Sequence, residues 1–365
     1  MNKNDAPAAR APAPREPDAR GRRITVFTFY ATCVLSGAIE LGGIFWALGQ
    51  GYGVVYAVGM TVAYQLGNIF LFLITRRIRK LQSLFVCVAL ILGRAVALLP
   101  GGSAVAYALC FVEVVLLSTL LQTMRSAVKG SEPRWRKRVF RVVGFAVSGV
   151  FFFAGNALMA AVPALLLALS VVTPRFDDGC WAARLIRGEY GDNRLCVAMV
   201  LHQMHYFVYC YAMLIIAFLG TGSPLAAGLW FVGNWVPYIA TEPLAKATKS
   251  SNWMVFFLGG HILVSTVLLG MYAVLSHSLT AALILWVLTG FGGGNVFCIK
   301  QLFECKRSYH SQIWVLSENI GHLLGVAALA GIALAGISLD ITLLIAAALA
   351  LSTVVVTYYS LHRAE

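Results

Sequence analysis

The sequence has little charge for its length. Charged residues make up 12% of its 365 residues, whereas hydrophobic residues make up 59% and the mean hydropathy is +0.79. A soluble domain carries about twice this share of charged residues. The shortage of charge therefore excludes a soluble protein and predicts a polytopic membrane protein.

Paired cysteines and nucleotide-binding motifs are also missing. The eight cysteines include no Cys-x-x-Cys pair, and several, such as Cys33 and Cys210, lie inside apolar runs, where cysteine is a small core residue. Gly292 to Gly294 lack the preceding strand and the following Lys-Ser/Thr of a phosphate-binding loop. We therefore expect no disulfide framework, no metal centre and no cofactor.

Basic residues outnumber acidic residues, but their distribution does not favour nucleic acid. The formal net charge is +13, and the Lys and Arg residues lie in short gaps between apolar runs. No soluble fold accompanies these basic stretches, so no nucleic-acid partner is expected. Basic gaps of this kind are typical of cytoplasmic loops. We expect an integral protein of a bacterial cytoplasmic (inner) membrane.

The N-terminal segment, residues 1–23, is rich in Ala, Pro and Arg. It has too little apolar content to fold and is expected to be disordered. The apolar run that follows is longer than the about 7 to 15 residues of a signal-peptide core. The arginines of this segment are therefore expected to hold it in the cytoplasm.

The stretch from Val139 to Thr173 decides the number of membrane spans, because it is too long for one helix and slightly short for two. Elsewhere, basic gaps and uncharged gaps alternate between the apolar runs. If this stretch crossed the membrane once, the basic gaps after it would lie outside, against the positive-inside rule. Two crossings, beginning near Trp135, restore the alternation. The basic gap from Arg125 to Arg141 is assigned to a cytoplasmic loop.

The sequence therefore predicts an all-α polytopic membrane protein with twelve transmembrane helices and both termini in the cytoplasm. The first six helices are expected within residues 24–173 and the last six within 197–365, with a cytoplasmic linker over 174–196. Each single run is near the roughly 20 residues that cross a bilayer. Apart from the double span, the expected helices are Ile24 to Leu48, Val54 to Ile74, Ser83 to Leu99, Ser103 to Met124, Val197 to Leu219, Leu225 to Ala240, Trp253 to Leu275, Leu279 to Phe297, Ile313 to Ala335 and Ile341 to Tyr359.

One stretch of the sequence indicates a duplicated architecture. GNIFLFLITRRIRK, Gly67 to Lys80, returns half a chain later as the faint copy GNWVPYIATEPLAK, Gly233 to Lys246. In the predicted topology the two stretches close helix two and helix eight, which are equivalent positions of two six-helix halves. Repeats of this kind are typical of transporters built from two related bundles.

The end of the first stretch resembles the loop after helix two in the major facilitator superfamily, whose pattern is G-x-L-x-D-R-x-G-R-[RK]. LFLITRRIRK supplies Leu73, Arg76, Arg79 and Lys80 in register. It departs from the pattern at both glycines and at the aspartate of the family's latch, where Thr75 stands. The resemblance implies two six-helix bundles and a gating loop at the three basic residues. The alternative is a basic cluster that only sets the topology.

Ionisable residues inside the expected helices are the candidates for function, because each is costly in hydrocarbon. Glu40, Glu113 and His205 fall near the mid-depth of helices one, four and seven, counting about 1.5 Å per residue. The family resemblance implies that these helices line a central cavity. We therefore predict that the three residues bind solute or protons at one depth.

Arg94 in helix three is expected within side-chain reach of the level of Glu40 and Glu113. A carboxylate beside an arginine stays ionised, whereas one that faces an apolar wall can take up a proton near neutral pH. One paired and one free carboxylate would together make a proton carrier. The alternative is a static pair of Arg94 and Glu113 that joins two helices.

Helix seven carries a stripe of aromatic, sulfur and imidazole side chains, with His205 beside it. The stripe is interpreted as a solute-binding wall that titrates through His202 or His205, as a copper path, since thioether, thiol and imidazole suit Cu(I), or as ordinary packing. The residues at helical spacing are Met199, His202, Tyr206, Tyr209, Cys210 and Met213.

The later helices add further candidates. Glu318 and His322 are four residues apart in helix eleven, so they can pair, form a gate or pass a proton. Asn295, near the end of helix ten, is expected to face the solute. His261 in helix nine is expected to be a lone structural residue.

These features favour a secondary active transporter, not an enzyme, that moves a small organic solute by alternating access coupled to protons. The solute class includes metabolites, antibiotics and siderophore-like compounds. A monomer surrounded by membrane lipid is expected. Two alternatives stay open: a copper or other metal importer of the same superfamily, and an integral membrane transferase. The transferase is disfavoured because the sequence has no Asp-rich or His-Asp motif at a membrane face.

Overall fold

The computed structural model describes residues 19–74, 78–98, 103–128, 134–172, 193–249, 252–293, 295, 298–299, 301 and 311–362. Eight helices in this part of the chain are long and apolar enough to cross a membrane, as an integral membrane protein requires. The α-helices are α1 Ala19–Gly49, α2 Gly53–Ile74, α3 Ile78–Leu98, α4 Ser103–Val128, α5 Arg134–Val147, α6 Val150–Val172, α8 Asn193–Thr221, α9 Pro224–Ala247, α10 Trp253–Leu275, α11 Leu279–Thr289, α13 Ser311–Leu334 and α14 Ile341–His362.

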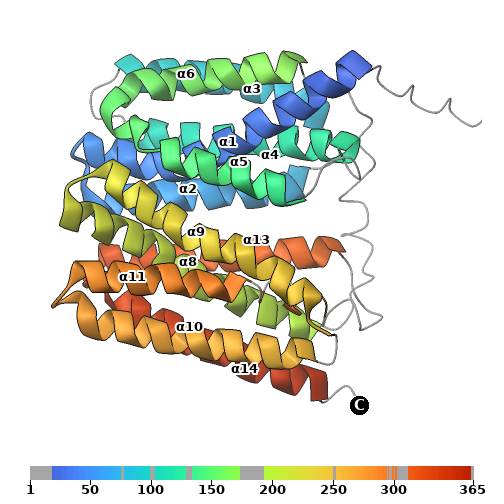
Figure 1. The fold of residues 1–365 in the computed structure, drawn as a ribbon. Helices are drawn as coiled ribbons and strands as arrows, with labels where there is room; N and C mark the ends of the chain where they lie inside the picture. Colours follow the sequence, from blue (N-terminus) through green and yellow to red (C-terminus); the bar gives the residue numbers. More distant parts are fainter. Residues whose placement is uncertain are drawn as a thin grey trace, which may run out of the picture.

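The helices form two groups that lie side by side (Figure 1). In the first group, α1 to α6, helix α1 packs against α2, α4, α5 and α6. In the second group, α8 to α14, helix α8 has the same place, against α9, α11, α13 and α14. When helices are counted in order within each group, nearly the same pairs are in contact in both. The two groups therefore share one architecture.

The two groups meet mainly along two helix pairs, α2 with α13 and α5 with α9. In each pair, the second helix of one group contacts the fifth helix of the other. The beginning of α1 and the end of α14 lie at the same end of the molecule (Figure 1). Such reciprocal contacts are what a two-fold relation between two repeats produces.

Helices α1 and α5 cross with their backbones in contact, and glycine makes this possible. A Cβ atom on Gly37 would overlap the carbonyl oxygen of Arg141, and a Cβ atom on Gly144 would overlap the carbonyl oxygen of Val34. Gly37 lies about one helical turn before Glu40. The close crossing therefore brings the middle of α5 beside the middle of α1.

The stretch of ambiguous length forms α5 and α6, and the chain changes direction at Gly155. This residue has φ 54° and ψ −138°, a conformation that glycine adopts and other residues avoid. Before it, the Phe151 ring packs against Gly42 of α1. After it, Pro163 packs against Gly93 of α3. The stretch therefore runs along two different helices of the first group, and the two membrane crossings stay a prediction.

Several helix ends differ from the sequence prediction. Helix α1 begins at Ala19 and α8 begins at Asn193, so both helices extend into segments predicted as tail and linker. Residues 1–18 and 174–192, the rest of those two segments, lie outside the described residues. Helix α5, in contrast, begins at Arg134, next to the start predicted near Trp135.

Glycine ends α11 earlier than predicted. The helix stops at Thr289 and continues as a 3₁₀-helix, η2 Gly290–Gly293. A Cβ atom on Gly290 would overlap the carbonyl oxygen of Asn234 in α9, and one on Gly292 would crowd Val264 in α10. These glycines therefore allow η2 to pack closely against α9 and α10.

The repeated Gly-Asn pairs occupy equivalent places in the two groups. Asn68 near the end of α2 accepts a 3.0 Å hydrogen bond from Ser118 of α4. Asn234 of α9 donates a 2.7 Å hydrogen bond to the carbonyl oxygen of Trp286 in α11. A Cβ atom on Gly67 would also overlap α4. In each group, the asparagine joins the second helix to the fourth.

The predicted gating loop falls partly outside the described residues, since Arg76 is not among them. Arg79 and Lys80 belong to the first turn of α3, which begins at Ile78. The basic stretch thus lies at a helix start, and its gating role stays a prediction.

Candidate functional site

Glu40 lies in the middle of α1 and is 4% exposed. Its Oε2 atom forms an ion pair with Nη2 of Arg141 in α5 and accepts a 3.4 Å hydrogen bond from the hydroxyl of Tyr64 in α2. Its Oε1 atom accepts a 2.8 Å hydrogen bond from the hydroxyl of Tyr211 in α8. Both carboxylate oxygens are therefore satisfied, by side chains from three other helices.

The bond from Tyr211 to Glu40 crosses from the second group of helices to the first. The amide of Gln65 in α2 makes the same crossing, because its Nε2 donates to the Tyr211 hydroxyl at 3.4 Å. Gln65 in turn accepts a 3.2 Å hydrogen bond from Asn68, which Ser118 of α4 also contacts. A polar network thus runs from α1 through α2 to α4 and is tied to α8 at Tyr211.

Arg141 is more exposed than the carboxylate that it binds. Its side chain is 32% exposed, whereas that of Glu40 is 2% exposed. The guanidinium carbon lies 5.9 Å from the ring centroid of Trp235 in α9, and that of Arg138, one turn earlier, lies 5.4 Å from the ring of Tyr238. Exposed cation–π contacts stabilise by about 0.5–1 kcal/mol each. The arginines of α5 therefore bind α9 across the boundary between the groups.

Arg94 does not take the position predicted for it. It is exposed on α3, and the cation that Glu40 contacts is Arg141. The reason is the glycine crossing, which places α5 beside the middle of α1. Glu113 is buried on α4 as predicted, 2% exposed, and its Oε1 atom has no hydrogen-bond partner among the described residues.

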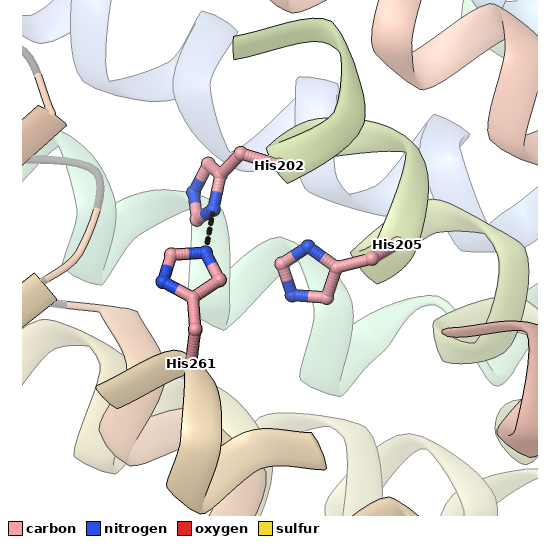
Figure 2. A group of neighbouring side chains, drawn as sticks. All are labelled: His202, His205 and His261. Carbon is pink, nitrogen blue, oxygen red and sulfur yellow. Dashed lines mark hydrogen bonds between the residues drawn. The ribbon is translucent and has the colours of Figure 1, made fainter. Parts of the chain in front are cut away.

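Three histidines lie together inside the second group, where α8 faces α10 (Figure 2). Nδ1 of His202 lies 2.9 Å from Nε2 of His261. The ring centroid of His205 lies 5.2 Å from that of His202 and 5.5 Å from that of His261. Each histidine is at most 5% exposed. The prediction that His261 is a lone residue is therefore wrong, because the i, i+3 spacing on α8 aims two imidazoles at α10.

Asn295 lies against this cluster and not where a solute was expected. Its Nδ2 atom is 3.1 Å from Nδ1 of His261, and the same Nδ1 atom lies 2.9 Å from the carbonyl oxygen of Phe257. A Cβ atom on Gly260 would overlap the Asn295 amide. The glycine before His261 therefore leaves the space in which Asn295 supports the imidazole.

The tyrosines of the α8 stripe point into the second group. The hydroxyl of Tyr206 donates to Oδ1 of Asn234 in α9 at 3.1 Å. The hydroxyl of Tyr209 donates to Oγ1 of Thr289 at the end of α11, also at 3.1 Å. Both hydroxyls are thus satisfied by neighbouring helices of the same group, which favours the packing interpretation for these two residues.

His322 is joined to α8 from α13. Its Nε2 atom lies 3.1 Å from Oε1 of Gln203, and its ring centroid lies 3.9 Å from that of Phe207. Glu318, one turn earlier on α13, is partly buried. His322 therefore belongs to the contact between α8 and α13. This is the main helix contact inside the second group, and the contact between α1 and α5 is its equivalent in the first group.

Sequence reasoning missed most of the polar network around Glu40. Arg141 was counted with the basic loop before it, although a helix that begins near Trp135 contains it. Gln65 interrupts the apolar run of α2, and a polar residue at that depth is itself a functional signal. Tyr211 carries no such signal, because only the fold brings α8 beside α1.

No protein-family model and no curated protein sequence matches the chain. Among solved structures, the nucleoside transporter NupG is similar with a TM-score of 0.67 and 11% identity, over 94% of this chain and 99% of that chain. A mutant of NupG has a TM-score of 0.58 and 12% identity, over 93% and 99% of the two chains. At these identities the likeness concerns the fold alone, which this chain shares with NupG.

Proposed function

We propose that the chain is a secondary active transporter that carries a small polar organic solute across a bacterial inner membrane. The first and second groups of helices act as six-helix halves that rock against each other, with both termini in the cytoplasm. The observation that carries the proposal is the bond from Tyr211 to Glu40, a buried contact between the halves. The reciprocal contacts α2–α13 and α5–α9 support the rocking motion.

The surroundings of Glu40 suit a solute with a ring and several hydroxyl or amide groups. The ring of Tyr211 is stacked on that of Phe231, with an interplanar angle of 11°, and Trp235 flanks the guanidinium of Arg141. The buried Nε atom of Arg141 has no hydrogen-bond partner among the described residues. Aromatic surfaces with a few polar groups are the usual lining of small-molecule sites. Nucleosides, the solutes for which the transporter NupG is named, have this chemistry and are the first solutes to test.

Proton coupling is proposed through two carboxyl groups with different surroundings. Ionised Glu40 holds Arg141 and Tyr211 together, so its protonation would remove the ion pair and loosen the contact between the halves. Glu113 has a buried oxygen without a partner among the described residues, and a lone charge there would be costly. A proton that moves between Glu40 and Glu113 would therefore change the charge of Glu40 and, through the ion pair with Arg141, the conformation of the transporter.

Uptake into proteoliposomes tests this function. With radiolabelled uridine and adenosine as probes, an inward proton gradient should raise accumulation several-fold over liposomes without protein. Glu40→Gln should lower the rate at least about tenfold, because each hydrogen bond to the charged carboxylate contributes about 1.5–3 kcal/mol. The control Tyr209→Phe removes a hydroxyl inside one half and should retain most of the rate.

The outcomes separate the parts of the proposal. Wild-type rates in Glu40→Gln would contradict the assignment of the site. Accumulation that does not respond to the gradient, with Glu113→Gln as active as the wild type, would contradict proton coupling and leave transport standing. Absence of uptake for every nucleoside would contradict the solute class.

A further inference from the structure

We propose that His202, His205 and His261 form a resident binding site for a transition-metal cation of the Zn²⁺ class, which fixes α8 to α10. The inference does not depend on the solute site at Glu40, because it rests on a different cluster. The three imidazoles are buried inside the second group of helices (Figure 2). They are also the one set of possible ligands that the described residues bring together.

The spacing of the imidazoles fits a small cation. One nitrogen from each of the three rings lies within 4.8 Å of the others. Three nitrogens bound to a tetrahedral Zn²⁺ at about 2.0–2.1 Å lie roughly 3.4 Å apart. Ring rotations that move the nitrogens by ~1 Å therefore close the site around an ion. The fourth position of the ion is left for another ligand.

The neighbours of His261 orient it as a ligand. Its Nδ1 atom faces the carbonyl oxygen of Phe257 at 2.9 Å, which leaves Nε2 directed at His202. Metal-bound histidines usually donate their other ring nitrogen to such a carbonyl, which fixes the tautomer and the ring orientation. Asn295 contacts the same edge of the ring from the other side.

Some polar atoms of the cluster are left without a hydrogen-bond partner among the described residues. Nδ1 of His205 and Oδ1 of Asn295 are buried and have no partner among the described residues. Such groups are costly in an apolar interior. A cation bound by the ring nitrogens removes part of this cost. Neutral imidazoles suit Zn²⁺, Cu²⁺, Ni²⁺ and Co²⁺ and not Mg²⁺ or Ca²⁺, which prefer oxygen.

The position of the cluster argues for a resident ion and against transported cargo. The principal contacts of α8 are with α9, α11, α13 and α14, so the imidazoles reach α10 across the interior of one half. The halves meet elsewhere, along α2–α13 and α5–α9. An ion carried between the halves would have no reason to enter this site. An ion held there would tie two helices of the same half.

Metal titration of the full-length protein tests the proposal. The protein is purified without a polyhistidine tag, stripped with a chelator and titrated with Co²⁺ and then Zn²⁺. We expect one Co²⁺ per chain, with the visible absorption of a four-coordinate ion, and its displacement by Zn²⁺. His202→Gln, His205→Gln and His261→Gln should each lower the affinity more than about 100-fold, beyond the 10–100-fold effect of losing an outer hydrogen bond. His277→Gln, in the turn after α10, is the matched control and should change nothing.

Two further measurements keep the proposal falsifiable should a variant not fold. The Cu²⁺ paramagnetic resonance spectrum of the wild type should show coupling to three nitrogens, and a spectrum with fewer than two would overturn the site. Saturating Zn²⁺ should raise the midpoint of thermal unfolding by about 3 °C or more. Binding that is equal in wild type and His205→Gln would overturn the ligand set. Accumulation of radioactive zinc in proteoliposomes would overturn the resident role.

Discussion

The hydroxyl of Tyr211 in α8 donates a 2.8 Å hydrogen bond to Oε1 of Glu40 in α1, so the two groups of helices are joined at a buried carboxylate. The other oxygen of the same carboxylate binds Arg141 of α5. One side chain thus holds both the α1–α5 crossing and the boundary between the groups. A conformational change that parts the groups at this point must break the bond to Tyr211.

Tyr211→Phe should destabilise the protein more than Tyr209→Phe. The first change removes a hydrogen bond to a charged group, worth about 1.5–3 kcal/mol, and the second a bond between two neutral hydroxyls, worth about 1 kcal/mol. Unfolding by denaturant in detergent measures the difference in the free energy of unfolding. Equal losses, or the reverse order, would mean that the carboxylate is not held by Tyr211.

Arg141→Met should cost more stability than the double variant Glu40→Gln with Arg141→Met. The single change leaves a buried carboxylate without its cation, which costs about 3 kcal/mol, the lower end of the usual range because Arg141 is partly exposed. The double change removes both charges and should recover at least half of the loss. A double variant as unstable as the sum of the two single variants would show that the residues do not interact.

Gly144→Ala should separate α1 from α5. The added methyl group would overlap the carbonyl oxygen of Val34. Overpacking of this kind lowers the free energy of unfolding by about 1–3 kcal/mol. Gly331→Ala in α13 is the matched control, because nothing lies within 4 Å of its added Cβ, and it should be neutral or stabilising by up to about 1 kcal/mol. The free energy of unfolding of the two variants distinguishes them, and equal values would contradict the close crossing.

Gly155→Ala should destabilise the change of direction in α6. The residue has φ 54°, and a side chain in such a conformation costs about 1–3 kcal/mol. Gly259→Ala in α10 is the control, since its added Cβ would meet nothing within 4 Å. Thermal unfolding of both variants is the measurement. If Gly155→Ala unfolds at the wild-type temperature, the chain does not turn there.

Hydropathy, together with the alternation of basic and uncharged gaps between apolar runs, was sufficient to predict most helices of this fold. Long apolar runs and basic gaps are local signals, and they located the ends of most helices within a few residues. Helix ends that depend on packing were missed, such as the stop of α11 at Thr289, where glycines approach α9 and α10. The start of α5 at Arg134 lies next to the start predicted near Trp135, although the first turns of this helix are basic.

The sequence singles out Glu40 as a candidate but not the residues that contact it. A carboxylate in the middle of an apolar helix is visible in any hydropathy profile. The choice of Arg141 over Arg94 depends on which helix crosses α1 at that level, and this is set by Gly37 and Gly144 through backbone contact. The gathering of His261 with the histidines of α8 depends in the same way on tertiary packing.

The most direct test of alternating access at Glu40 needs no knowledge of the solute. Ser36 lies one turn before Glu40, with its Oγ atom 3.5 Å from the hydroxyl of Tyr64. Ser265 is buried inside the second group and bonded to the carbonyl oxygen of Ala347 at 3.2 Å. Ser36→Cys and Ser265→Cys, each in a chain without its eight natural cysteines, therefore form a matched pair.

The measurement is the labelling of these two variants by a membrane-impermeant thiol reagent, added to either face of oriented vesicles. A transporter that opens its central site to each side in turn predicts labelling of Ser36→Cys from both faces and of Ser265→Cys from neither. Labelling of Ser36→Cys from one face alone, or from neither face, would contradict the account.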